Sequence, residues 1–210
     1  MPARTPAPRK LPAAPGREGI LAAALPLFAA AGFHGVSMRE VAAAARVTPA
    51  ALYYHFPDKE QLYLALIAHV YSDRIPPLIA QMAAGAEPWQ RLENLVAGFV
   101  RLCVADPQLT RLGQWILLDT DPARSRLLAE NVFRPLFAAI TQLAQELGGG
   151  FDAQRLTASV IGLVMFPFQC AVVTRHLPGF PAPADAGEAD ALIAHIVKLL
   201  RGGVACGWNP

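Results

Sequence analysis

A short segment between two prolines restricts the fold of this chain most strongly. Residues 46 to 62 read RVTPAALYYHFPDKEQL. Thr48 followed by Pro49 is a typical helix start, because Thr caps free amides and Pro lacks an amide that would be unpaired there. Pro57 ends the helix, because the residue before a proline avoids helical torsion angles. The helix therefore spans only about Pro49 to His55.

Two further helices are predicted before this segment. Apolar residues recur at steps of three and four from Ile20, and Gly32 follows them as a helix-ending cap. Ser37 to Glu40 reads SMRE, a capping box in which the Ser hydroxyl and the Glu carboxylate each take an amide of the first turn. The second helix therefore begins after Ser37 and runs to about Ala45.

A longer helix is predicted after the segment. Asp58 to Gln61 reads DKEQ and repeats the capping pattern, so this helix begins at Lys59 and runs to about Ile75, where Pro76 and Pro77 end it. Two short helices joined by three residues, with a helix on either side, form a helix-turn-helix unit.

Helical signals continue to the last residues, and no alternating strand pattern is present. The expected fold is all-α, with an N-terminal helix-turn-helix domain and a larger helical domain. The expected division is a disordered basic arm with five prolines at 1–16, a first domain at 17–62 and a second at 63–210. The later helices are expected at Pro88 to Ala105, Pro107 to Leu118, Pro122 to Leu147, Asp152 to His176 and Gly187 to Arg201.

The apolar content is high, since hydrophobic residues make up 54% of the chain and charged residues 16%. A large core or a subunit interface follows. Residues 156 to 174 carry no charge and resemble a membrane span, but Pro167, Gln169 and three hydroxyl groups favour a helix covered by protein on all sides. A secretion leader near the start is disfavoured by Glu18 at the edge of its apolar run and by Pro26 inside it.

Basic residues are concentrated at the N-terminal end. Residues 1–60 hold seven Lys or Arg against four Asp or Glu, whereas residues 61–210 hold eleven against twelve. A basic face there is compatible with a nucleic-acid partner but does not require one. Cys103, Cys170 and Cys206 match no metal or disulfide spacing, which indicates reduced thiols and a cytoplasmic protein.

The short helix has more aromatic residues than it can bury. Leu52 and Phe56 have the spacing of a core stripe, which leaves Tyr53, Tyr54 and His55 pointing outward. From the spacing alone, these three either cover the domain's own core or form a contact surface. A helix of this width enters the major groove of DNA, where Tyr and His side chains reach phosphate oxygens.

The same residues carry a resemblance to a known family. The stretch from about Arg17 to Leu66 resembles the DNA-binding domain of the TetR/AcrR family of bacterial transcriptional regulators. The family's pattern around its recognition helix is matched by Thr48, Ala50, Leu52, Tyr53, Tyr54, His55, Phe56 and Lys59. The resemblance implies a homodimer that places two such helices on a palindromic double-stranded DNA operator, with an effector-binding domain behind them.

The resemblance also implies a role for single residues. Ser37 and Thr48 resemble phosphate-contacting caps, and Arg39 resembles a base-contacting residue. Arg46 stands where the family usually has Gly. The groove-facing start of the recognition helix corresponds to Pro49, Ala50 and Ala51, and its phosphate anchors correspond to Tyr53, Tyr54, His55 and Lys59. The N-terminal arm is either plain disorder or a minor-groove contact.

The second domain is expected to hold an effector cavity and a dimer interface. An apolar cavity for a small hydrophobic or aromatic effector is expected to be lined by Phe99, Trp115, Phe133, Phe137, Met165 and Phe168. The last two helices are expected to form half of a four-helix interface between subunits. Its expected positions are Val160, Leu163, Val164, Ala171, Leu192, Ile196 and Leu199.

These features predict a ligand-responsive DNA-binding regulator, a repressor released from its operator by the effector. We expect no enzymatic activity, metal, cofactor or membrane partner, since no catalytic or phosphate-binding motif occurs. The alternative is a helical small-molecule-binding or catalytic protein that uses its N-terminal domain for protein contacts.

Overall fold

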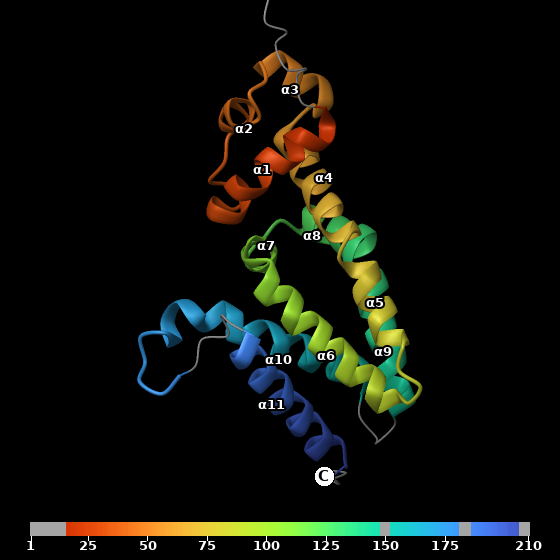
Figure 1. Cartoon of the computed structure of the whole chain (residues 1–210). Helices are drawn as coiled ribbons and strands as arrows, with labels where there is room; N and C mark the ends of the chain where they lie inside the picture. Colours follow the sequence, from red (N-terminus) through yellow and green to blue (C-terminus); the bar gives the residue numbers. More distant parts are fainter. Residues whose placement is uncertain (1–15, 148–151, 181–185, 206–210) are drawn as a thin grey trace, which may run out of the picture.

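The computed structural model describes residues 16–147, 152–180 and 186–205, and every regular element in these ranges is a helix (Figure 1). The expected all-α class is confirmed. Apart from Gly16, the arm expected at 1–16 lies outside the described residues.

The first three helices agree with the caps predicted at Gly32, Ser37 and Thr48. They are α1 (Arg17–Ala31), α2 (Met38–Ala45) and α3 (Pro49–His55). The three residues between α2 and α3 form the tight turn of the helix-turn-helix unit.

The next helix is shorter than expected. Helix α4 (Lys59–Ser72) starts at the Asp58 cap, whose carboxylate accepts from the Gln61 amide at 2.8 Å, but it stops before the two prolines. A further helix, α5 (Ile75–Ala83), was not foreseen. Pro76 and Pro77 do not end a helix, in contrast to the prediction; they occupy the first turn of α5, where a missing amide costs no hydrogen bond.

The expected helix over residues 122–147 is interrupted. Residues 129–133 form a π-helical turn, a rare conformation that is frequent at functional sites. The elements of this central region are α6 (Pro88–Ala105), α7 (Pro107–Leu117), α8 (Pro122–Leu128), η1 (Ala129–Phe133) and α9 (Arg134–Leu147). The last two helices are α10 (Ala153–Thr174) and α11 (Ala186–Ala205).

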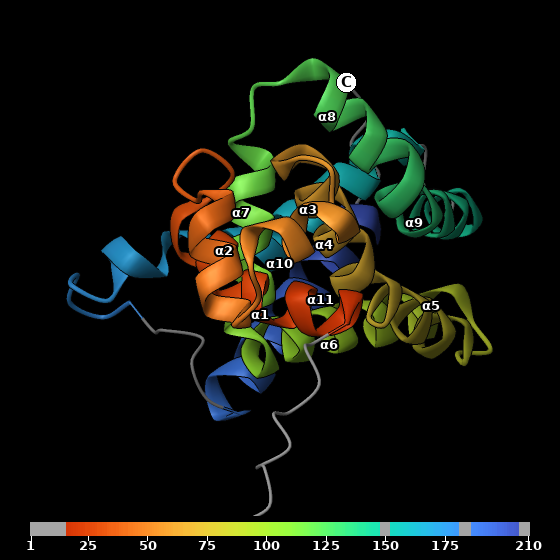
Figure 2. The same cartoon turned by 90° about the horizontal axis from the view of Figure 1, so that it is seen from above.

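One continuous core runs from Ile20 in α1 to Leu200 in α11. Helix α1 contacts α2, α4 and α7, whereas α6 contacts α5, α9, α10 and α11. In the folded molecule, helix α3 lies at one end and helix α11 lies toward the opposite end (Figure 1). Seen from the α3 end, α2 and α3 lie in front of the remaining helices (Figure 2). Helix α3 is therefore free to meet another molecule end-on.

Candidate nucleic-acid interface and effector cavity

The turn between α2 and α3 is built around a left-handed residue. Arg46 has φ 55° and ψ 38°, the single positive φ of a non-glycine residue in the described part of the chain. Its amide donates to the Ala43 carbonyl at 3.1 Å, and the Val47 amide donates to the Ala42 carbonyl at 3.0 Å. This closes the end of α2 as a glycine does, although a side chain in this conformation costs about 1 kcal/mol. The Arg46 side chain is exposed.

Helix α3 buries one row of side chains and exposes another. Leu52 and Phe56 are 0% and 1% exposed, whereas Tyr53 and Tyr54 are 51% and 85% exposed. His55 is half-buried, and its ring meets the Tyr54 ring edge-on at 5.3 Å. The outward direction expected for the tyrosines is confirmed, so neither serves to cover the core.

The start of α3 is apolar and accessible. Pro49 and Ala50 are exposed, and Ala51 is half-buried. The Thr48 hydroxyl accepts a hydrogen bond from the Ala51 amide at 3.2 Å, so the expected cap is present. Apolar groups at this position can contact thymine methyls but provide no donors for base edges.

The capping box at the start of α2 is complete. The Ser37 amide donates to the Glu40 carboxylate at 2.7 Å, and the Glu40 amide donates to the Ser37 hydroxyl at 3.3 Å. The hydrogen bonds from the Ser37 side chain and backbone hold the pKa of Glu40 below its usual value. Ser37 is exposed, so its hydroxyl oxygen remains open to a further partner.

The two expected cationic contacts differ in their surroundings. Arg39 is exposed on α2. The Lys59 ammonium group is half-buried instead: it donates to the Val36 carbonyl at 3.1 Å and lies 4.4 Å from the centre of the Phe33 ring. A phosphate contact by Lys59 therefore has to compete with two existing partners.

Arg124 joins α8 to the N-terminal helices. Its residue is 3% exposed, and its guanidinium group makes two hydrogen bonds to the Asp119 carboxylate, the Nη2 bond being 2.9 Å long. It also lies 3.5 Å from a Glu60 carboxylate oxygen and 3.9 Å from the Phe33 ring centre. The hydrogen bond from Arg124 holds the pKa of Asp119 below its usual range. Sequence reasoning missed this cluster, because nothing in the sequence relates Arg124 to the distant Glu60.

Trp115 forms a second junction between α7 and α1. Its indole nitrogen donates to the Ala29 carbonyl at 3.1 Å. Gly32 has φ 66°, and a Cβ atom at this position would lie 2.7 Å from Trp115 Cδ2. The expectation that Trp115 lines the effector cavity is therefore wrong, since the ring is packed against the end of α1.

A small apolar cavity lies inside the helical domain. Its volume is about 180 Å³. Four of the six expected residues line it, namely Phe99, Phe133, Phe137 and Met165. Phe168 was also expected there but packs against the core away from the lining. The other lining residues include Tyr71, Leu78, Cys103, Leu109, Gly113 and Ile161.

The polar groups around this inner cavity carry no free charge. The Arg74 guanidinium group is paired with the Asp106 carboxylate at 2.7 Å. Burial raises the pKa of the Cys103 thiol to about 12, and burial also raises the pKa of Tyr71. The thiol and the phenol are therefore neutral at neutral pH, and the inner cavity suits an uncharged apolar group.

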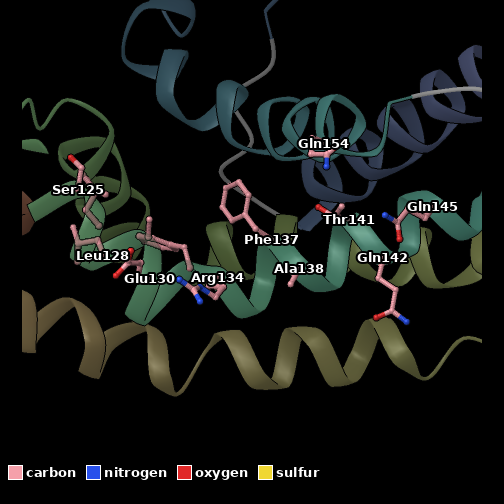
Figure 3. Close-up of a pocket in the computed structure, with 13 residues that line it drawn as sticks. Ser125, Leu128, Glu130, Arg134, Phe137, Ala138, Thr141, Gln142, Gln145 and Gln154 are labelled. Atoms are coloured by element: carbon pink, nitrogen blue, oxygen red, sulfur yellow. The ribbon is translucent and has the colours of Figure 1, made fainter. Parts of the chain in front are cut away.

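A larger and more polar hollow adjoins the inner cavity. It has a volume of about 730 Å³ and is lined by η1, α9 and parts of α7, α8 and α10. Phe137, Thr141 and Gln145 follow one another along the side of α9 that faces Gln154 of α10 (Figure 3). Ile116, Phe133 and Phe137 line both spaces, so these three side chains form the boundary between them.

Helix α10 is apolar on two sides but buried on one. By length and composition it could cross a membrane, with a mean hydropathy of 2.0 over its most apolar stretch. One side packs on α6, α7 and α9, while Phe166 and Val173 on the other side are 65% and 60% exposed. The expected cover by protein on all sides is thus not provided within the described part of one chain.

Three of the expected interface positions need correction. Val160, Val164 and Ile196 are at most 1% exposed, because they pack into the chain's own core. They are therefore not available to a second subunit. Leu199 is 49% exposed, and the remaining positions are half-buried, namely Leu163, Ala171 and Leu192.

The fold and the α2–α3 unit together define a helix-turn-helix protein with a helical cavity-bearing domain. Comparison with known proteins gives the family. Residues 20–66 match the family described as "Bacterial regulatory proteins, tetR family". The N-terminal part of the chain is therefore similar to the TetR family of regulators, in agreement with the resemblance seen in its residues.

Two curated relatives illustrate the extent of the similarity. The transcriptional regulator RutR of Escherichia coli (strain K12) is 39% identical over 64 residues, which cover 30% of this chain and 30% of RutR. The transcriptional repressor KstR of Mycobacterium tuberculosis (strain ATCC 25618 / H37Rv) is 29% identical over 188 residues, covering 89% of this chain and 80% of KstR. The identity is therefore higher over the short matched stretch than over most of the chain.

A solved structure shows the same fold over most of the chain. The transcriptional regulator FadR from Bacillus subtilis, in complex with stearoyl-CoA, matches with a TM-score of 0.73 and 15% identity. The match covers 87% of this chain and 98% of FadR. At this identity the likeness concerns the fold alone.

Proposed function

We propose that this chain is a dimeric, ligand-responsive transcriptional repressor of the cytoplasm, released from a palindromic operator by a small hydrophobic effector. The observation that carries the proposal is the exposed row on α3. Tyr53 and Tyr54 are 51% and 85% exposed on a seven-residue helix that lies at one end of the molecule. Large exposed aromatic tips on such a helix suit the phosphate-lined major groove.

In this proposal, residues 17–62 bind DNA and residues 63–210 bind the effector and the second subunit. Helix α4 crosses this boundary without a break, so it can carry a movement from one part to the other. The apolar start of α3 leaves few direct hydrogen bonds to bases. Specificity then depends on Arg39, on contacts to thymine methyls and on DNA shape.

The dimer interface is proposed on the outer side of α10 and on α11. Phe166, Val173 and Leu199 are exposed apolar side chains there. Gly162 of α10 is also exposed, and a Cβ atom added to it would have open space around it. A four-helix interface would cover this surface. It would also place two α3 helices about 34 to 36 Å apart, as successive half-sites require.

A salt titration tests the DNA-binding part of the proposal. The purified chain is titrated onto DNA from upstream of its own gene, with affinity measured by fluorescence anisotropy at several salt concentrations. Phosphate contacts release counterions, so the logarithm of the affinity should fall by several units per logarithmic unit of salt. Absence of binding at low salt, or a flat salt dependence, contradicts the proposal.

Lys59→Ala is expected to make that slope shallower by about one unit for each half-site. Arg126→Ala, a change of an exposed basic residue on α8, is the matched control and should leave the slope unchanged. If both variants behave alike, Lys59 serves only its contacts with Val36 and Phe33.

A further inference from the structure

The two adjoining spaces in the helical domain differ in chemistry, and this difference defines a ligand. The inner cavity of about 180 Å³ is smaller than the roughly 300 Å³ at which small-molecule sites usually begin. It is also apolar, and its one arginine is neutralised by Asp106. A ligand with any sizeable polar part must therefore extend into the outer hollow.

The outer hollow supplies the complementary polar groups. Its lining includes Thr141, Gln142, Gln145 and Gln154, whose hydroxyl and amide groups can hydrogen-bond a polar ligand. Arg134 and Glu130 also line it. Among the described residues, Arg134 has no acidic group within salt-bridge distance, so its guanidinium group remains available to an anion.

The π-helical turn lies where the two spaces meet. Phe133 ends this turn, its ring contacts Tyr71 edge-on at 5.0 Å, and its side chain lines both spaces. Phe137, one helical turn later, also lines both and is 44% exposed. A chain that enters the inner cavity from the hollow must pass these two rings.

Resting on the proposed function, we propose that the effector is an amphipathic molecule with a short apolar chain and a polar, negatively charged head. The chain occupies the inner cavity and the head lies beside Arg134 in the hollow. A volume of about 180 Å³ is the volume that about six water molecules occupy in the liquid. A methylene group has about the same volume as one water molecule. The site therefore accepts a chain of about six carbons.

The small volume of the inner cavity sets this limit, and its wall is closely packed at Gly113. A Cβ atom on Gly113 would lie 3.2 Å from the Tyr71 hydroxyl and 3.6 Å from the Met165 methyl group. Tyr71, Gly113 and Met165 all line the cavity, so a side chain added at Gly113 would reduce its volume. The limit distinguishes this site from one that takes a chain as long as stearoyl.

The test uses the full-length chain and a series of acyl probes. Butanoate, hexanoate, octanoate, dodecanoate and hexadecanoate form one arm, and their coenzyme A thioesters form a second arm that tests a large polar carrier. Binding is measured by calorimetry. Each buried methylene should raise the affinity about fourfold until the cavity is full, after which longer chains should gain nothing or bind more weakly.

Two variants test the two halves of the site. Gly113→Ala adds a methyl group to the cavity wall and should shift the best chain length down by about one carbon, while Ala also favours the helix. Arg134→Gln should weaken binding of the carboxylates about fivefold but leave the matching alcohols unaffected. Arg126→Gln, on α8 and outside both linings, is the matched control.

Affinity that rises steadily to hexadecanoate, an equal effect of Arg134→Gln on acids and alcohols, or no binding of any probe overturns the inference. DNA binding without a probe is measured first on the same preparation. Loss of that binding overturns the proposed function, whereas DNA binding with the wrong chain-length profile overturns only the inference about the ligand.

Discussion

The side chains of the helix-turn-helix unit divide between those that build it and those left free to contact DNA. Leu52 and Phe56 are buried, and the Ser37 and Thr48 hydroxyls are engaged as caps. Arg46 is different, because its backbone adopts a conformation that glycine reaches without steric cost. Its positive charge, exposed beside α3, is a physical reason to keep an arginine there.

Arg46→Gly should therefore raise the free energy of unfolding by about 1 kcal/mol, since it relieves the strain of the left-handed residue. Urea denaturation of the two proteins measures the difference. Arg46→Lys is the control, because it keeps a side chain in the same conformation and should leave stability unchanged. A lower unfolding free energy for Arg46→Gly would show that the arginine side chain makes stabilising contacts.

The helices differ in how far the sequence could define them. Gly32 marks the end of α1, the capping box at Ser37 marks the start of α2, and Thr48 with Pro57 marks both ends of α3, so these helices were predicted closely. A proline can lie either outside a helix or in its first turn, however. Pro57 lies before the start of α4, whereas Pro76 lies inside the first turn of α5. Only the packing of α5 against α6 shows that a helix follows.

Packing also decided which aromatic residues face the cavity. Phe99 and Phe137 line it as expected, but Trp115 packs against Gly32 instead. Helical spacing shows which residues share a side of a helix, but it does not show which neighbour that side meets. The same limit explains why Val164 was assigned to the dimer interface although it lies in the core.

Arg124 of α8 is a buried charge paired with Asp119, and Arg124→Met tests how much this pair contributes to stability. Removal of the guanidinium group leaves the Asp119 carboxylate buried without its partner, so stability at neutral pH should fall by about 3 kcal/mol. Urea denaturation measures this loss. Arg126→Met, an exposed change on the same helix, should have little effect.

The loss should also depend on pH. Because Arg124 lowers the pKa of Asp119 in the folded protein, the pair contributes stability above the unfolded pKa of about 4. That contribution disappears as the pH falls through the lower folded pKa. The difference between the native protein and Arg124→Met should therefore shrink in acid, and a pH-independent difference would exclude Asp119 as the partner that matters.

In the proposed dimer, a second copy covers the exposed apolar side of α10 and supplies the second α3 helix. Phe166→Asp places a charge at the centre of the exposed side of α10 and should convert the dimer to a monomer. Sedimentation velocity measures the oligomeric state. Operator affinity should fall about a hundredfold, because two linked contacts become one, although α3 is unchanged.

Leu127→Asp is the matched control, since Leu127 is 42% exposed on α8, apart from α10 and α11. It should remain dimeric and bind DNA normally. A dimeric Phe166→Asp protein would move the interface to another surface.

The contact between Gly32 and Trp115 bears on the construction of hybrid regulators. A hybrid could join the helix-turn-helix domain of another protein to the helical domain of this chain. The first helix of the grafted domain must then end in glycine, because any Cβ there would collide with the indole ring of Trp115. A donor with a larger residue at that place needs a smaller partner for residue 115. Compatible helix-turn-helix domains can therefore be chosen by inspecting positions 32 and 115 before any gene is assembled.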